Sequence, residues 1–406
     1  MQQSSSPVLN KVLKGGLCSG CGACAALAQG AVAMRISEQG FLRPVQSGPL
    51  SQQQEHRIAL TCPGVGLRQQ PDGRSDHPLW GPFIGMYSGH ATDPGLRRTA
   101  SSGGGLSALL VYLLETGAVD HVLQVAADPD LPIGNRTVLS SHRNSILAAA
   151  GSRYAPSAPL AGLEPYLASG HRYAFVGKPC DVAALQAMKR FDDRVAQRFP
   201  YLLSFFCAGV PSLAGAREVL AGLGVAEADV AQFRYRGDGW PGFATATLAD
   251  GSQKQMSYAD SWGGILSRHV QFRCKICPDG TGGFADVVCA DAWEADENGY
   301  PVFTERDGVS LIVGRTEKGE ALIRAAAADG RLEITRFAAA GLAAIQPGQT
   351  GKRRYTLSRL LALRVLGRPA PSYRGFHLLR NAAAAGLWAN VRNFLGTARR
   401  IVLGRP

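Results

Sequence analysis

Residues 173–207 read YAFVGKPCDVAALQAMKRFDDRVAQRFPYLLSFFC, and this stretch decides the fold class. It begins and ends with short apolar runs, Tyr173–Gly177 and Tyr201–Cys207, and Asp181–Arg190 between them resembles a helix. Short apolar runs rich in aromatic residues predict buried strands, and strands that alternate with helices are typical of an α/β sheet.

The same alternation extends over roughly residues 80–345. Further strands are predicted at Met86–Ala91 and His121–Ala126, with a helix at Leu106–Thr116 that Gly117 ends. Alternating residues around Gly242–Leu248 and Val302–Val313 predict an added antiparallel portion. We therefore expect a mixed sheet, which the polar, turn-rich residues 70–80 separate from a smaller N-terminal module.

Length and charge narrow the class of protein. A chain of 406 residues predicts two or more domains. Its net charge of +12 is confined to residues 352–406, which hold twelve Lys and Arg and no Asp or Glu, and the other residues hold 31 of each sign. A neutral body argues against a nucleic-acid-binding protein. No secretory signal and no apolar run long enough to span a membrane are present, so we expect a cytoplasmic protein.

Nine cysteines without an export signal predict metal or redox chemistry rather than disulfides. Cys18, Cys21 and Cys24 form C-x2-C-x2-C, a spacing that lets one loop place three thiolates around a 4Fe-4S cluster. Ala28 stands where a bacterial ferredoxin run has its fourth cysteine, so the remaining ligand must be distant, and Cys62, which precedes a proline, is the candidate. A zinc site or unliganded thiols are the alternatives.

The other cysteines are scattered. Cys180 and Cys207 each follow a predicted strand, and Cys274 and Cys277 form a C-x2-C pair. Strand ends meet at one edge of an α/β sheet, so these four thiols form a candidate second cluster, with buried structural cysteines as the alternative. We expect Cys289 to be a small buried residue.

A glycine-rich turn, Ser101-Ser102-Gly103-Gly104-Gly105, leads into a predicted helix. Backbone amides at a helix N-terminus suit a phosphate, and Arg97 and Arg98 could pair with a diphosphate. The alternative is an ordinary loop in which a serine caps the helix.

Seven motifs in order carry a resemblance to a known family: CSGCGAC, SSGGG, GSRYAPS, GKPCD, FFCAG, RCKICPD and ADVVCADAW, within residues 15–345. The chain resembles the beta subunits of coenzyme F-420 hydrogenase and dehydrogenase, a family that includes 7-hydroxymethyl chlorophyll a reductase and ferredoxin-dependent divinyl chlorophyllide reductase. The resemblance implies FAD at the glycine-rich turn, with Ser152, Arg153 and Tyr154 beside it. Lys178 is a further candidate contact for flavin or substrate, or a solvated lysine.

The resemblance also implies that Cys180, Cys207, Cys274 and Cys277 bind a second 4Fe-4S cluster. The expected architecture is a ferredoxin-like iron–sulfur module at 1–75, a mixed-sheet α/β domain for FAD and iron–sulfur at 80–345, and a basic helical tail at 352–406. The absent cysteine at Ala28 departs from the two-cluster versions of the N-terminal module.

These parts predict an oxidoreductase that relays electrons from ferredoxin, or another low-potential carrier, through 4Fe-4S clusters to FAD, which exchanges a hydride with an organic substrate. One alternative is the coenzyme F-420-reducing subunit of a hydrogenase or formate dehydrogenase complex. Another is a degenerate family member with a non-catalytic role in polysaccharide biosynthesis. His269 and Asp279 are candidate proton donors for which a structural role is the simpler interpretation, and a homo-oligomer stays open.

The tail has helical periodicity, since Leu379, Leu387, Val391 and Ile401 recur at helical spacing while Arg380 and Arg392 fall off that stripe. We expect an amphipathic basic helix. It could contact an anionic membrane surface or dock an acidic partner such as ferredoxin. The alternative is a helix packed on the protein with its arginines in solvent.

Overall fold

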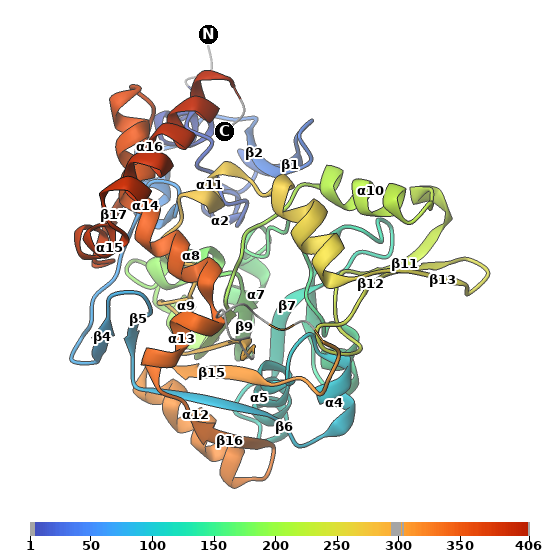
Figure 1. Ribbon diagram of the computed structural model, residues 1–406. Helices are drawn as coiled ribbons and strands as arrows, with labels where there is room; N and C mark the ends of the chain where they lie inside the picture. Colours follow the sequence, from blue (N-terminus) through green and yellow to red (C-terminus); the bar gives the residue numbers. More distant parts are fainter. Residues whose placement is uncertain (1–4, 294–301, 303, 405–406) are drawn as a thin grey trace.

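A computed structural model describes residues 5–293, 302 and 304–404, and one eight-stranded sheet lies at its centre (Figure 1). The strand order is β16-β6-β15-β14-β10-β9-β7-β8. β7, β9, β10 and β14 are parallel, and antiparallel strands flank them on both sides, so the predicted mixed α/β sheet is confirmed. The strands are β6 (Gly85–Ala91), β7 (His121–Ala127), β8 (Asn135–Ser140), β9 (Tyr173–Gly177), β10 (Tyr201–Phe205), β14 (Val287–Asp291), β15 (Ser310–Gly314) and β16 (Leu332–Arg336).

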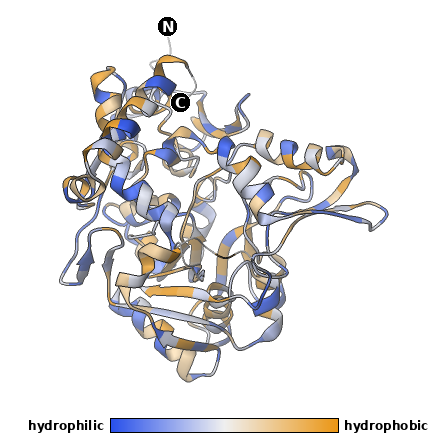
Figure 2. Ribbon diagram, viewed as in Figure 1, coloured by the Kyte–Doolittle hydropathy of each residue, from blue (hydrophilic) through white to orange (hydrophobic). Residues whose placement is uncertain are grey.

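Helices cover both faces of the sheet because successive residues of each buried strand point to opposite sides. In β9, Phe175 belongs to the buried cluster that includes residues of α7, α8, α9 and α13, whereas Ala174 and Val176 belong to the cluster that includes residues of α4, α5, α6 and α12. Figure 2 shows hydrophobic residues concentrated in the central strands between these layers. The helices are α4 (Pro94–Thr99), α5 (Gly105–Glu115), α6 (Arg143–Ala148), α7 (Glu164–Ala168), α8 (Pro179–Met188), α9 (Asp193–Arg198), α12 (Glu317–Ala328) and α13 (Leu342–Ile345).

The added antiparallel portion differs from its prediction in extent. The sequence predicted alternation from 302 to 313, but strand β15 covers only Ser310–Gly314. Residue 303 lies outside the described residues. Glu305 instead lies in a loop, where its carboxylate accepts hydrogen bonds from the backbone amides of Trp240 and Gly242. The stretch around 242–248 joins a separate three-stranded sheet beside α10. The elements here are α10 (Leu213–Gly222), η1 (Glu227–Asp229), β11 (Val230–Arg234), β12 (Ala244–Leu248), β13 (Gln253–Met256), the π-helix η2 (Ala259–Ile265) and η3 (Leu266–His269).

The N-terminal residues form a small module against α8. Ser51 begins α3 with a capping box, since its hydroxyl accepts from the Gln54 amide while the Gln54 side chain accepts from the Ser51 amide. The Leu160 amide donates to the Cys21 carbonyl, which ties the module to the central domain. The elements are α1 (Pro7–Lys14), α2 (Ala23–Leu27), β1 (Val32–Ile36), β2 (Leu42–Gln46), α3 (Gln52–Thr61), β3 (Gly66–Arg68), β4 (Ser75–His77) and β5 (Gly81–Phe83).

The C-terminal region is folded onto the N-terminal module rather than extended from the core. Its first helix begins at Pro347, before the expected boundary at 352, and the single expected helix is several helices, with Gly386 at φ 78° between the last two. β17 pairs in parallel with β3, and α14 to α16 pack against one another. No helix among the described residues is long and apolar enough to cross a membrane. The remaining elements are α11 (Phe272–Lys275), η4 (Ala339–Gly341), α14 (Pro347–Val365), β17 (Ser372–Arg374), α15 (Leu378–Ala385) and α16 (Leu387–Val402).

Candidate functional site

A cavity of about 290 Å³, the large cavity, lies at the carboxyl ends of the parallel strands. Its wall includes Val125 near the end of β7, Gly177 of β9, Phe205 of β10 and Asp291 of β14. In α/β sheets, ligands commonly bind at the carboxyl ends of adjacent parallel strands. The volume is near the lower end of the roughly 300–1,000 Å³ typical of small-molecule sites.

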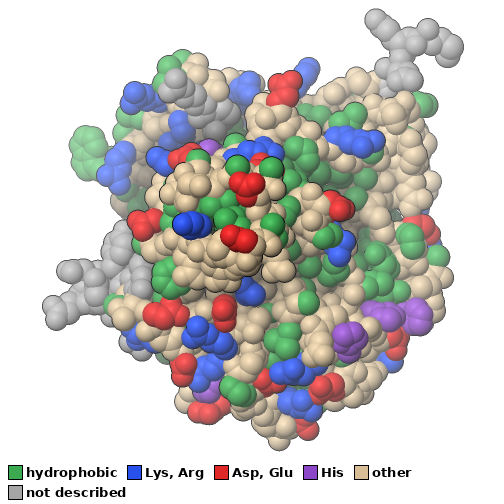
Figure 3. All heavy atoms as spheres, turned by 90° about the vertical axis from the view of Figure 1, so that its right-hand side faces the viewer, with side chains coloured by type: hydrophobic (Ala, Val, Ile, Leu, Met, Phe, Trp, Pro, Cys, Tyr) green, Lys and Arg blue, Asp and Glu red, His purple; other side chains and the backbone are tan. Residues whose placement is uncertain are grey.

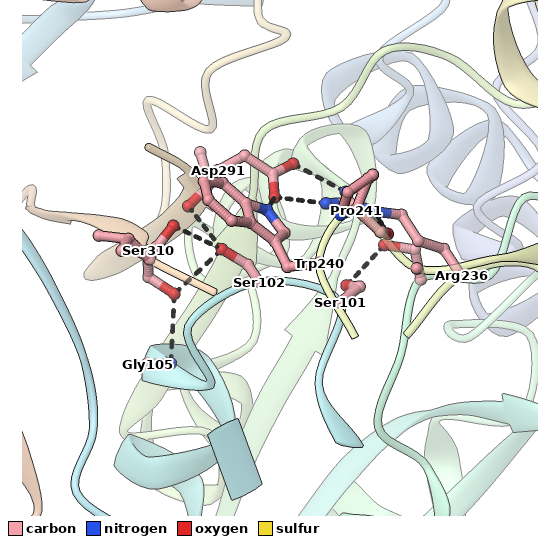
Figure 4. Close-up of polar contacts among 12 residues, drawn as sticks. Ser101, Ser102, Gly105, Arg236, Trp240, Pro241, Asp291 and Ser310 are labelled. Carbon is pink, nitrogen blue, oxygen red and sulfur yellow. Dashed lines mark hydrogen bonds and ion pairs between the residues drawn. The ribbon is translucent and has the colours of Figure 1, made fainter. Parts of the chain in front are cut away.

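The glycine-rich turn forms one side of this cavity. Ser101, Ser102 and Gly104 line it, together with the first turn of α5. The Ser102 hydroxyl lies 3.0 Å from the Val309 carbonyl and 3.2 Å from the Ser310 hydroxyl, which also accepts from the Gly105 amide (Figure 4). First-turn amides have no partner inside their helix, so the N-terminus of α5 suits an anionic group.

Packing explains the glycines of this turn. A Cβ on Gly103 would lie 2.7 Å from the Ser310 amide nitrogen and 2.9 Å from the Gly89 carbonyl oxygen, so the turn can sit against β6 and β15 only without a side chain there. Gly104 has φ 74°, the left-handed conformation that glycine adopts most readily. Gly103 is not among the residues that line the large cavity, so its place is in the packing behind the wall.

Arg97 and Arg98 do not line the large cavity, in contrast to the expected pairing with a diphosphate. The Arg97 Nε donates to the Gly308 carbonyl at 3.0 Å, and Arg98 lies at the surface, 3.4 Å from Asp238. The helix that carries them, α4, ends at Thr99, before the turn reaches the cavity. The structure therefore does not bring Arg97 and Arg98 to the wall of this cavity, and their contact with a diphosphate stays a prediction.

The other predicted contacts do line the large cavity: Ser152, Arg153, Tyr154 and Lys178. The Ser152 hydroxyl donates to the Ser101 hydroxyl at 2.7 Å, which joins the two loops. The Arg153 guanidinium binds Asn135 and backbone carbonyls, so it holds the loop in place. Lys178 pairs with Asp181 at 2.8 Å.

An arginine–tryptophan cluster on the same wall was missed from the sequence. Arg236 donates two hydrogen bonds to Asp291, at 2.7 and 2.8 Å, and the Trp240 indole donates to the same carboxylate at 2.8 Å (Figure 4). Trp240 and Trp293 stack with ring centroids 4.7 Å apart, and the Arg236 guanidinium lies over Trp293. Arg236, Asp291 and Trp293 line the cavity, as does Tyr258. The glycine- and aromatic-rich stretch RYRGDGWPGF at 234–243 was a signal for it.

The N-terminal cysteine set, Cys18, Cys21, Cys24 and Cys62, meets at one small apolar cavity that all four residues line. Burial raises the pKa of Cys21 to about 12 and that of Cys62 to about 11. The thiolate charges of Cys21, Cys18 and Cys62 add to the effect of burial and raise the pKa of Cys24 as well. Such mutual effects require the four sulfurs to be neighbours, so the structure brings this predicted set together.

The central cysteine set, Cys180, Cys207, Cys274 and Cys277, also converges. Burial, followed by the charge of Cys274, raises the pKa of Cys207 to about 12, and Cys277 acts in the same direction. Burial also raises the pKa of Cys180, with smaller effects from the charges of Cys207 and Cys274. Cys207 lies two residues beyond β10 and Cys180 at the start of α8, so strand ends and α11 supply the set.

The two cysteine sets are adjacent. Arg273 is buried, donates to the Pro63 carbonyl beside Cys62 at 2.9 Å, and its charge lowers the pKa of both Cys18 and Cys277 against the effect of burial. The Gln271 amide contacts the Ser19 carbonyl and the Cys274 sulfur, at 3.4 and 3.5 Å. Cys207 lines the large cavity, so the central set lies between the N-terminal set and the cavity.

The chemistry of these donors fits iron–sulfur clusters. Among residues 5–293, 302 and 304–404, no group of three or more His, Cys, Asp or Glu side chains is arranged to hold a single metal ion. A 4Fe-4S cluster places each thiolate on a different iron, which spaces the sulfurs more widely than one zinc ion does. Each set offers four neighbouring thiols, the number that one such cluster takes; Cys18 and Cys21 are buried and the other six are partly buried.

The remaining singled-out residues have structural partners. Burial raises the pKa of Cys289 to about 12, and this thiol lies in the core beside the large cavity. His269 pairs with Glu218 at 2.7 Å, and Asp279 accepts from the Gly283 amide at 2.8 Å. Neither His269 nor Asp279 lines the large cavity.

Comparison with known proteins identifies a family. Two family models match, the N-terminal part of the coenzyme F420 hydrogenase/dehydrogenase beta subunit at residues 86–164 and its C terminus at residues 170–340. The coenzyme F420 hydrogenase subunit beta of Methanococcus voltae is 26% identical over 72% of this chain and 99% of its own length. The F420-dependent formate dehydrogenase 1 subunit beta of Methanococcus maripaludis is also 26% identical, over 60% of each chain.

A solved structure shares the fold. A chain of the F420-reducing [NiFe] hydrogenase complex from Methanosarcina barkeri superposes with a TM-score of 0.52 at 22% identity, over 70% of this chain and 96% of that chain. Together the two family models match more than half of the sequence. The chain belongs to the coenzyme F420 hydrogenase/dehydrogenase beta subunit family.

Proposed function

We propose that the protein is an oxidoreductase that exchanges a hydride with coenzyme F420 at the large cavity and single electrons with a protein partner through two cysteine-bound clusters. The observation that carries the proposal is that Cys207 belongs to the central cysteine set and also lines the large cavity. The relatives named for coenzyme F420 favour this function over ferredoxin-linked reduction of another organic substrate, the first expectation from the sequence.

Each cofactor has candidate ligands in the chain. The N-terminal and central cysteine sets would each hold a 4Fe-4S cluster, and the large cavity would hold FAD, with its phosphates at the first turn of α5. Clusters pass single electrons, and a flavin can combine two of them with a proton into a hydride. The arginine–tryptophan cluster supplies flat surfaces for a planar ring, since Trp293 and Tyr258 both line the cavity.

Two positively charged residues, Arg273 and Lys352, lie beside the cysteine sets. Arg273 is buried between the two sets, so its guanidinium offsets negative charge on the thiolates. Lys352 donates to the Cys207 carbonyl at 3.1 Å, and its charge lowers the pKa of Cys207 against burial. Cys18 and Cys21 are buried, so the fold keeps water from these two thiols.

The test is F420 reduction by the full chain. The protein is reconstituted with iron, sulfide and FAD without oxygen and mixed with a reduced one-electron dye, and the absorbance of coenzyme F420 is followed. We expect F420 to be reduced, and a Ser102→Ala and Arg236→Ala double variant to retain its clusters and lose this activity. If the loaded protein reduces other acceptors but never F420, the substrate assignment is wrong.

A further inference from the structure

Helix α16 turns a polar face toward the protein. The Asn390 side chain hydrogen-bonds to Ser358 of α14, and Asn393 accepts from Arg359 at 2.9 Å. Thr397 is completely buried and donates to the Asn393 carbonyl at 2.8 Å. These three residues recur at steps of three and four, so they form one face of the helix, and that face is packed on α14.

The opposite face of α16 is apolar and exposed. Leu387 is 77% exposed, Trp388 85% and Leu395 58%. Val391 and Val402 are exposed on the same side, because a helix advances about 100° per residue. We call Leu387, Trp388, Val391, Leu395 and Val402 the α16 stripe. A surface helix normally buries its apolar face, so packing within this chain does not account for the stripe.

Positive charge borders the α16 stripe. Arg392 and Arg399 are exposed and seven residues apart, so they lie along one edge of it. Residues 352–406 contain no Asp or Glu. By contrast, the face of the molecule that carries α10 and the three-stranded sheet mixes both signs of charge (Figure 3).

The neighbouring helices α14 and α15 also expose apolar and basic side chains. Leu379 of α15 and Val365 of α14 are 78% and 71% exposed, and both helices pack against α16. Arg364, Arg368 and Arg380 are exposed beside them. Not all of the positive charge is available, since Arg353 of α14 is buried and donates to the Leu79 carbonyl.

We propose that α16 lies flat on an anionic lipid surface, with the α16 stripe among the acyl chains and its arginines at the headgroups. Trp and Leu on one face and arginine beside them are typical of helices that lie in a membrane interface. At 16 residues, α16 is about 24 Å long, which is shorter than a spanning helix. The surface lies beyond residue 340, where the match to the family ends, so it is separate from the proposed redox function.

Other occupants fit this surface less well. A second copy would bring two arginine-rich helices together without any acidic residue from either tail. A protein interface commonly has a hydrogen bond for about every 100–200 Å². Of the side chains in the α16 stripe, only the Trp388 indole can donate one, and none can accept one.

The experiment is sedimentation of the full chain with vesicles of phosphatidylcholine, alone or mixed with phosphatidylglycerol. We expect binding to the mixed vesicles only, and weaker binding in added salt. The Arg392→Gln and Arg399→Gln double variant should lower the partition coefficient about 10- to 30-fold, and the Leu387→Ser, Trp388→Ser and Leu395→Ser variant should abolish binding. Leu139→Ser and Arg336→Gln, exposed positions on β8 and β16, serve as matched controls and should bind normally.

Folding and alternative partners are checked in the same samples. Circular dichroism and iron content should match between all variants, because the changed side chains face solvent. The tryptophan fluorescence of the full chain should shift to shorter wavelength on mixed vesicles, because Trp388 enters the lipid. The Trp388→Phe variant should show no such shift. The proposal is overturned if the full chain binds neither kind of vesicle or binds both equally well. It is also overturned if the full chain self-associates without binding lipid and the serine variant no longer self-associates, since the α16 stripe would then be an interface between copies.

Discussion

The two cysteine sets reach a similar arrangement by different routes. Three members of the N-terminal set come from one short loop, Cys18 to Cys24, and line a small apolar cavity. The central set is collected from three distant segments, at the ends of β9 and β10 and at α11. Only the central set borders the large cavity, through Cys207. The difference teaches that local spacing can bring four thiols together, whereas placing such a set beside a cavity depends on the topology of the sheet.

The largest expected effect comes from Cys207→Ala, because this residue belongs to both the central set and the large cavity. Even changes outside the ligand shell typically cost about 10–100-fold in metal affinity, so loss of a ligand should lower F420 reduction by more than about 100-fold. Iron should fall by about four per chain. Iron analysis and the F420 assay measure both. The control Cys289→Ala removes a buried thiol outside both sets and should keep its iron; equal loss in both variants would refute the assignment.

Cys21→Ala should have a narrower effect, since the N-terminal set has its own cavity. We expect the loss of about four irons and of one cluster signal in electron paramagnetic resonance, while FAD stays bound. Flavin absorbance after gel filtration measures the retained cofactor. If FAD is lost together with the cluster, the two sets are not separate units.

Arg236→Ala tests the wall of the large cavity. Breaking a buried ion pair costs about 3–5 kcal/mol because the partner charge is left unpaired, and Asp291 would be that partner. Denaturant unfolding and FAD titration should show lower stability and weaker binding. Arg98→Ala, which breaks a surface pair with Asp238, should change the free energy of unfolding by no more than about 1 kcal/mol and leave FAD affinity unchanged. Weaker FAD binding in the Arg98 variant alone would restore the arginine site expected from the sequence.

The smallest expected effect is that of Gly103→Ala. Its methyl group would meet backbone atoms of Ser310 and Gly89, and such overpacking costs about 1–3 kcal/mol. Thermal unfolding measures this change. Gly348→Ala has open space around it in α14, so the control should be neutral or slightly stabilising. Equal melting temperatures for the Gly103 variant and the parent would show that the turn can move away from the sheet.

Buried runs and local spacings were the most predictable features. Strand β9 has the expected bounds, because every residue of it is apolar or glycine and every one is buried. The fourth N-terminal cysteine, Cys62, was expected because it precedes a proline, and it lies with the other three. In both cases the signal is local, so it is present in the sequence.

Features that depend on distant partners could not be predicted. Arg236 and Asp291 are 55 residues apart, and nothing in either segment indicates the other. The periodicity of α16 is visible in the sequence, yet which face is buried depends on α14, whose Ser358 and Arg359 bind the polar face. The placement of Arg97 outside the wall of the large cavity likewise depends on a distant partner, because its guanidinium donates to the carbonyl of Gly308.

The most direct test of the central claim is electron paramagnetic resonance of the reduced, anaerobically prepared protein, with iron counted in the same sample. The account predicts about eight irons per chain and two clusters whose spectra interact, because Arg273 contacts the loop of Cys62 and lies beside Cys277. Cys21→Ala should simplify the spectrum to one isolated cluster. One zinc ion, four irons, or two spectra that simply add without interaction would contradict it.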